Sequence, residues 1–133
     1  MSYKIIDNFL DKEHLSIIQG LIFDTEFPWR RREELVTNAN DGIYFTHCFY
    51  NDMESTSPNF TTVIKPILIK LKCIAPIQIR SNMFISKLFK KSDFHTDYKN
   101  TKSKTAIFYL NTCDGGTEIK IEDKIKFIKA DEN

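Results

Sequence analysis

Apolar residues are spaced like a helix near the start of this chain and like strands further on. Four apolar residues recur at intervals of three and four, namely Leu15, Ile18, Leu21 and Ile22. This spacing predicts an amphipathic helix. Asp11 is a good N-cap for it, because its carboxylate can accept hydrogen bonds from the first backbone N–H groups of the helix. Residues 3–6 fit a short strand before this helix.

A second apolar stripe follows Ser57 and Pro58, which together mark the start of a helix. Its members are Val63, Ile64, Ile67, Leu68 and Leu71. Pro66 lies inside the stripe, and a proline within a helix removes one backbone hydrogen bond. We therefore expect a kink or a late start in place of one unbroken helix.

Strand patterns occupy most of the remaining chain. Residues 43–50 are rich in aromatic and β-branched side chains and predict a strand. From Ile77 onward the pattern alternates between apolar and polar, which predicts strands with one wet face. The alternating segments are residues 77–85, 117–122 and 124–128. Residues 105–111 are also strand-like, and Asp114-Gly115-Gly116 then fits a hairpin turn because glycine admits positive φ.

This order of elements predicts an α+β chain, mainly β, as a single domain over residues 1–133. Helices outside antiparallel strands fit a double-stranded β-helix, the jelly-roll or cupin-like barrel, with N-terminal supporting helices. Such a barrel needs about eight strands. Only about six segments after Ile43 are plausible strands. The shortfall leads us to expect that the last strands of the barrel are missing from the chain.

Composition narrows the classes of partner. The net charge is +1, so we expect no nucleic acid and no membrane as partner. Arg30-Arg31-Arg32 is the compact basic run, offset by Glu33-Glu34, and is read as a solvated end of an element or as a partner contact. Three cysteines without a CxxC or CxxH pair indicate neither a disulfide framework nor structural zinc. The chain shows no signal peptide or long apolar run, which favours the cytoplasm.

His95-Thr96-Asp97 is the motif with the most specific chemistry. On an extended segment, residues i and i+2 point to one side, so the imidazole and the carboxylate would lie next to each other. Such a pair supplies two ligands of the two-His-one-carboxylate triad that binds non-haem Fe(II). The structural alternative is a His and an Asp at a strand end that cap a turn.

The setting of the motif adds weight to the metal interpretation. Phe94 and Tyr98 flank it, and the strand-like residues 105–111 and a turn at residues 114–117 follow. In this order they resemble the 2-oxoglutarate/Fe(II)-dependent dioxygenases, in particular the prolyl-4-hydroxylase-like branch and its small phage and marine-microbial relatives. The likeness covers most of the chain. In the family a distal His and a carboxylate-binding basic residue follow, and in this chain no His or Arg comes after Asp97. We expect either that a partner copy completes the fold or that the sequence is cut short.

The resemblance implies His95 and Asp97 as metal ligands, Fe(II) as cofactor, 2-oxoglutarate as co-substrate and ascorbate as an optional reductant. Tyr109 matches the family tyrosine whose hydroxyl meets the distal carboxylate of 2-oxoglutarate, although a barrel-core aromatic fits as well. Thr105 is a weaker candidate for binding the co-substrate, four residues earlier on the same predicted face.

Three further residues carry open assignments. Asn82 either bonds the co-substrate or faces solvent, because a polar side chain amid Ile and Phe needs a reason to face inward. Arg80 shares the predicted face of Asn82 and either helps to bind a carboxylate or, more simply, lies on the surface. Apart from His95, His47 is the histidine that could serve as a third metal ligand.

The implied activity is oxidation of an unidentified small-molecule or peptidyl substrate, with 2-oxoglutarate decarboxylated to succinate. Two alternatives from other classes stay open. The first is a non-catalytic jelly-roll that binds a ligand without metal. The second is a module that forms homo-oligomers through exposed strand edges, and it predicts association that depends on concentration.

Overall fold

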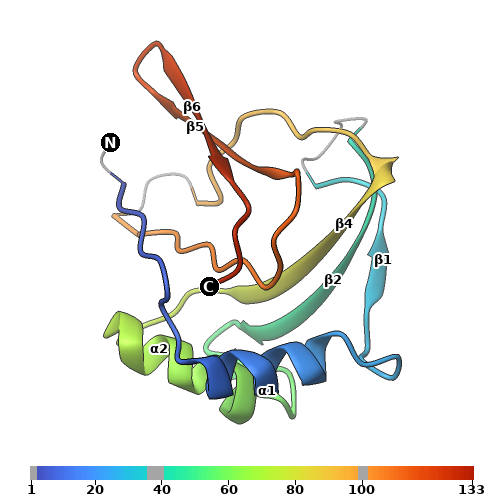
Figure 1. Cartoon of the computed structure of the whole chain (residues 1–133), viewed down its shortest axis with the longest axis vertical. Helices are drawn as coiled ribbons and strands as arrows, with labels where there is room; N and C mark the ends of the chain where they lie inside the picture. Colours follow the sequence, from blue (N-terminus) through green and yellow to red (C-terminus); the bar gives the residue numbers. More distant parts are fainter. Residues whose placement is uncertain (1–2, 36–40, 99–101) are drawn as a thin grey trace. The chain divides into compact units, whose positions relative to one another are not determined.

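The computed structural model describes residues 3–35, 41–98 and 102–133. The chain forms two compact units, shown with their elements in Figure 1. The terminal unit comprises Met1–Gln19 and Thr96–Asn133, and the central unit comprises Gly20–His95. Helix α1 (Lys12–Ile22) begins in the terminal unit and ends in the central one.

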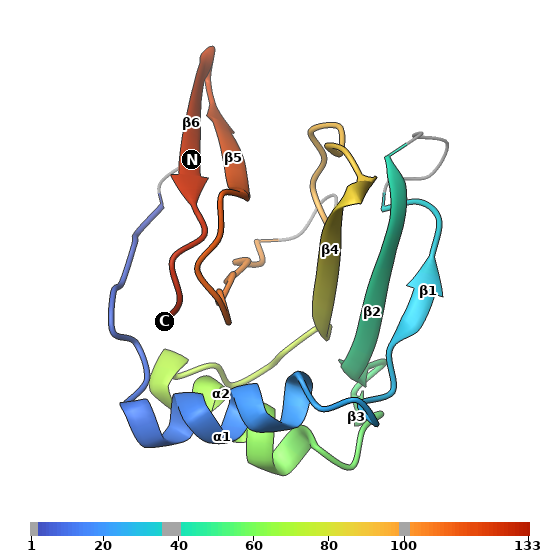
Figure 2. The same cartoon turned by 45° about the vertical axis from the view of Figure 1, so that its right-hand side comes forward.

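The central unit contains a four-stranded antiparallel sheet, whose longer strands stand side by side in Figure 2. Its strands are β1 (Arg30–Arg32), β2 (Gly42–Asn51), β3 (Glu54–Ser55) and β4 (Ile79–Phe89). Strand β2 is central, because β1 and β3 pair with it near its two ends while β4 pairs along its length. The predicted strands at residues 43–50 and 77–85 are therefore confirmed, with the second extended by four residues to Phe89.

One face of this sheet carries an aromatic core. Phe49 is fully buried, and its ring lies 4.6 Å from His47 and 6.2 Å from Phe27. Phe27 also lies 4.5 Å from His47, measured between ring centroids. The three rings belong to β2 and to the loop before β1, so they fix that loop against the sheet.

The second helix starts late, as the position of Pro66 predicted. A π-helical turn, η1 (Phe60–Ile64), comes first, and the α-helix α2 (Lys65–Leu71) follows it. Pro66 thus lies in the first turn of α2, where its missing N–H costs no helical hydrogen bond. Val63 and Ile64 are the buried residues of this region.

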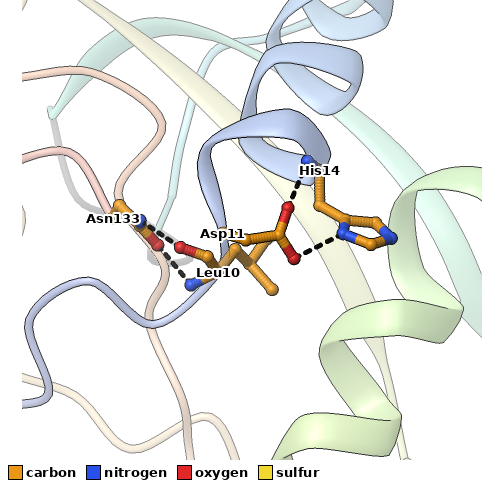
Figure 3. Close-up of polar contacts among 4 residues, drawn as sticks. All are labelled: Leu10, Asp11, His14 and Asn133. Atoms are coloured by element: carbon orange, nitrogen blue, oxygen red, sulfur yellow. Dashed lines mark hydrogen bonds and ion pairs between the residues drawn. The ribbon is translucent and has the colours of Figure 1, made fainter.

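Helix α1 begins where the sequence predicted. The Asp11 carboxylate accepts a hydrogen bond from the backbone N–H of His14 at 2.9 Å and contacts the His14 ring Nδ1 at 2.6 Å (Figure 3). These bonds hold the pKa of the Asp11 carboxyl below its usual value, the backbone bond being the larger cause. Leu15, Ile18 and Ile22 are buried, which confirms the amphipathic pattern.

The terminal unit contains a hairpin of β5 (Gly116–Ile121) and β6 (Lys124–Lys129). Its turn is Glu122-Asp123, with Glu122 at a positive φ of 53°. The prediction that residues 114–116 form the hairpin turn is wrong, because they lead into β5 and Gly115 pairs with Ala130. Gly116 is needed for close approach, since a Cβ there would lie 2.1 Å from the Ile128 carbonyl oxygen.

Two predicted strands are absent from the described residues, at positions 3–6 and 105–111. The backbone of the second segment is held by separate contacts. The Tyr109 carbonyl accepts from the N–H of Asn133 at 3.0 Å, and the Leu110 carbonyl accepts from the Gln19 side chain at 2.7 Å. Separate bonds do not form a ladder, so strand propensity alone did not produce a strand here.

The α+β class is confirmed, with two α-helices and six strands in two small antiparallel sheets. In the described part of the chain these sheets do not close into a barrel. None of the described helices combines the length and apolarity needed to cross a membrane.

Candidate functional site

His95 lies six residues past the end of β4, exposed, in a segment without regular structure. His95 therefore lies outside the strands of the described chain. Its ring Nδ1 is 2.9 Å from the Asp93 carbonyl oxygen. A carbonyl oxygen only accepts, so Nδ1 carries a proton and donates it to this bond. Metal-binding histidines commonly hold their second nitrogen in this way.

Asp97 belongs to the terminal unit and is exposed, in a bend. Its Oδ2 lies 3.5 Å from the Thr105 hydroxyl, at the outer limit of a hydrogen bond. The structure thus brings two of the predicted site residues together. The contact is weak, but it orients one carboxylate oxygen toward a hydroxyl donor.

Tyr109 is half-buried, and its hydroxyl donates to the Thr117 Oγ1 of β5 at 2.7 Å. This bond supplies the polar partner that a half-buried tyrosine requires. The sequence placed Tyr109 and Thr105 on one strand face. In the structure no strand is formed there, and the two residues have different polar neighbours.

Asn82 lies on β4 directly opposite Thr46 of β2, and both are half-buried. The Thr46 hydroxyl donates to Asn82 Oδ1 at 2.9 Å and is also within 3.1 Å of the Ser81 carbonyl oxygen. The cross-strand bond fixes the orientation of the Asn82 amide. Arg80, two residues earlier, is exposed, in line with the surface assignment.

His47 is a buried histidine with both ring nitrogens engaged. Its Nδ1 donates to the Pro28 carbonyl at 3.1 Å, and its Nε2 therefore accepts from the Ser57 hydroxyl at 2.8 Å. This arrangement argues against His47 as a third metal ligand. The pair of His47 and Ser57 could not be predicted from the sequence. The two residues are ten positions apart, and no sequence motif connects them.

Asn133 forms the polar cluster shown in Figure 3. Its side chain bonds both backbone groups of Leu10: Oδ1 accepts from N–H at 2.6 Å, and Nδ2 donates to the carbonyl at 2.7 Å. Its carbonyl accepts from Phe9 N–H at 3.3 Å. The amide side chain of Asn133 has one acceptor and one donor, as a peptide group does, so it bonds Leu10 in the way a residue of a neighbouring strand would. No sequence pattern indicated this structural contact.

His95 and Asp97 are the residues that could belong to a metal site. Among the described residues, no group of three or more His, Cys, Asp or Glu side chains could hold a metal ion. The imidazole of His95 and the carboxylate of Asp97 match in type two of the three protein ligands in a facial Fe(II) triad. The two side chains therefore suit iron by their chemical type, but the described residues supply no third ligand.

Comparison of the chain with family models, with curated proteins and with solved structures finds no match. A functional assignment accordingly depends on the motif and on the contacts described above. Of these, the oriented imidazole of His95 is the feature most specific to metal binding.

Proposed function

We propose that this chain carries part of an Fe(II)- and 2-oxoglutarate-dependent dioxygenase of the prolyl-4-hydroxylase-like type. His95 and Asp97 hold the metal, and Tyr109 binds the far carboxylate of 2-oxoglutarate. The observation that carries the proposal is the His95 ring, whose Nδ1 donates to the Asp93 carbonyl and is thereby oriented. With 2-oxoglutarate, bound iron supplies the oxidising chemistry that hydroxylates a substrate and releases succinate and carbon dioxide.

The proposed fold is the double-stranded β-helix of that family. The order of elements supports it: a long antiparallel strand, β4, precedes the motif, and the hairpin of β5 and β6 follows it. By the same resemblance, the complete metal centre has a third protein ligand and a basic partner for the carboxylate. His95 and Asp97 supply two of the three protein ligands in this proposal.

Each proposed ligand has a neighbour that orients it. The Asp93 carbonyl sets the tautomer of His95, and the Thr105 hydroxyl approaches one oxygen of Asp97. The Tyr109 hydroxyl donates to Thr117, so its lone pairs remain able to accept and its proton must turn to reach a carboxylate. Tyr109 therefore exchanges one partner for another when the co-substrate binds.

The test is metal binding by the 133-residue chain. Mn(II) serves as a redox-inert probe for the iron site, and free Mn(II) is followed by electron paramagnetic resonance with and without 2-oxoglutarate. We expect weak binding that 2-oxoglutarate tightens and that His95→Ala and Asp97→Ala each abolish. His14→Ala and Asp123→Ala are matched controls, because they remove one exposed imidazole and one exposed carboxylate elsewhere. Equal loss in both pairs, or no binding, refutes the proposal.

An oligomerising module is the second candidate, and one feature of β4 favours it. In the described residues β4 pairs with β2 alone, and Phe84, Ile85 and Leu88 on it are exposed. Open strand edges with apolar residues promote pairing between chains. Sedimentation that depends on protein concentration, with no Mn(II) binding, would select this function over the oxygenase.

A further inference from the structure

One face of the four-stranded sheet gathers arginine side chains. Residues directly opposite in antiparallel strands share a face. In one row Arg30 of β1 lies opposite Thr46, which lies opposite Asn82 of β4. In the row on one side of it Arg32 lies opposite Tyr44, which lies opposite Phe84, and in the row on the other side Arg80 lies opposite Cys48. The arginine face is thus defined by Arg30, Arg32, Tyr44, Thr46, Arg80, Asn82 and Phe84.

The charge on this face is of one sign. Strands β1, β2 and β4 contain no Asp or Glu, and Arg30, Arg32 and Arg80 are exposed. Within the described ranges none of these three guanidinium groups has an ion pair or a hydrogen bond. Arg31 points to the opposite face, where it is paired with Glu33 at 2.7 Å. Uncompensated guanidinium groups make the arginine face locally positive.

The arginine and amide nitrogens on this face are donors. Asn82 Oδ1 is occupied by the Thr46 hydroxyl, which leaves the amide nitrogen, and in the described structure this nitrogen has no partner. Guanidinium and amide N–H groups only donate. A ligand of this face must therefore supply acceptors. Guanidinium groups match carboxylate and phosphate oxygens in pairs, which favours an oxyanion.

An exposed aromatic ring lies in the same rows. Phe84 is 47% exposed, and its ring stacks on Tyr44 with centroids 5.6 Å apart and planes inclined by 25°. Phe89 lies 4.6 Å from Phe84 and also contacts Tyr44 at 6.1 Å. The three rings support one another, so Phe84 offers a fixed surface on which a planar group can stack.

We propose that the arginine face binds a nucleotide unit, with its phosphate on the guanidinium groups and its base on Phe84. A free nucleotide and a single-stranded nucleic acid present the same phosphate and base, so the chemistry of the site covers both. The net charge of +1 gives no strong long-range attraction, and the contact is local. This inference rests on residues of β1, β2 and β4 and does not use His95 or Asp97.

The test measures the anisotropy of a labelled short oligothymidylate, with free thymidine monophosphate and inorganic phosphate as competitors. If each of the three arginines neutralises one phosphate of the oligothymidylate, the logarithm of its association constant falls with the logarithm of salt concentration with a slope of about −2. Replacing Arg30, Arg32 and Arg80 together by Gln should weaken binding at least about tenfold and flatten this slope. The matched control replaces Lys12, Lys120 and Lys124 by Gln, which removes the same charge from the terminal unit.

Phe84→Leu tests recognition of the base, since it keeps an apolar side chain but removes the ring. We expect it to weaken binding by about fivefold or more, with the circular dichroism spectrum unchanged. Competition by the mononucleotide assigns the free ligand, and binding of the oligonucleotide alone assigns a single strand. Equal effects of the two triple variants, no binding, or phosphate competing as well as the mononucleotide with Phe84→Leu unaffected would each overturn the proposal.

Discussion

Ser57→Ala is expected to destabilise the central unit well beyond an ordinary serine substitution. Ser57 is buried, and its hydroxyl donates to Nε2 of the buried His47 at 2.8 Å. The same oxygen accepts from the Asn59 N–H at 3.2 Å. Alanine removes both bonds and leaves the His47 nitrogen without a donor beside the ring of Phe27.

The magnitude follows from the burial of these groups. An ordinary intramolecular hydrogen bond contributes about 0.5–1.5 kcal/mol, and a buried polar atom left unsatisfied costs about 1–3 kcal/mol. The Asn59 bond is only part-buried, so the His47 contact dominates. We therefore expect Ser57→Ala to lower the free energy of unfolding by about 2–4 kcal/mol.

Urea denaturation at neutral pH, followed by circular dichroism and by the fluorescence of Trp29, measures this change. The matched control is Ser16→Ala on the exposed side of α1, where alanine favours the helix and stability should not fall. Ser57→Thr keeps a hydroxyl and should recover part of the loss. A decrease below about 0.5 kcal/mol for Ser57→Ala, or one equal to that of the control, would refute the role given to the His47 bond.

Two further predictions concern the terminal unit and helix α1. Because the pKa of Asp11 is lowered by the His14 bonds, its contribution to stability is present above the usual carboxyl pKa and is lost as pH falls through the lowered value. Asp11→Asn keeps an N-cap but should remove this part of the acid dependence of the helical circular dichroism signal; an unchanged acid profile would contradict the assignment. Gly116→Ala would place a Cβ 2.1 Å from the Ile128 carbonyl oxygen. It should lower the free energy of unfolding, measured by urea denaturation, by about 1–3 kcal/mol. Gly20→Ala meets nothing within 4 Å and should stabilise α1 by about 0.5–1 kcal/mol, so equal effects of the two alanines would disprove the steric argument.

The elements that could be predicted are those whose signal lies within a few neighbouring residues. The helix after Asp11, the strand around His47 and the late start at Pro66 each follow from local periodicity, capping or proline geometry. The predicted strand at residues 105–111 failed for the opposite reason. A strand is completed by a partner strand, and propensity cannot supply one.

The candidate site divides in the same way. The sequence alone determined which side chains have metal-ligand chemistry, because the imidazole of His95 and the carboxylate of Asp97 are two residues apart in the chain. The Asp93 carbonyl that sets the tautomer of His95 became visible only in three dimensions. The same holds for the Thr46 hydroxyl that turns the Asn82 amide.

Tertiary structure also decided where charge collects. In the sequence Arg30-Arg31-Arg32 is a basic run offset by two glutamates, and Arg80 lies about fifty residues away. Because side chains alternate along β1, Arg31 lies on one face of the sheet, where it pairs with Glu33. Arg30 and Arg32 lie on the other face. Pairing of β4 with β2 then adds Arg80 to that second face. Local order along the chain determines the periodicity of each element, but only strand register determines which side chains from distant segments meet on one surface.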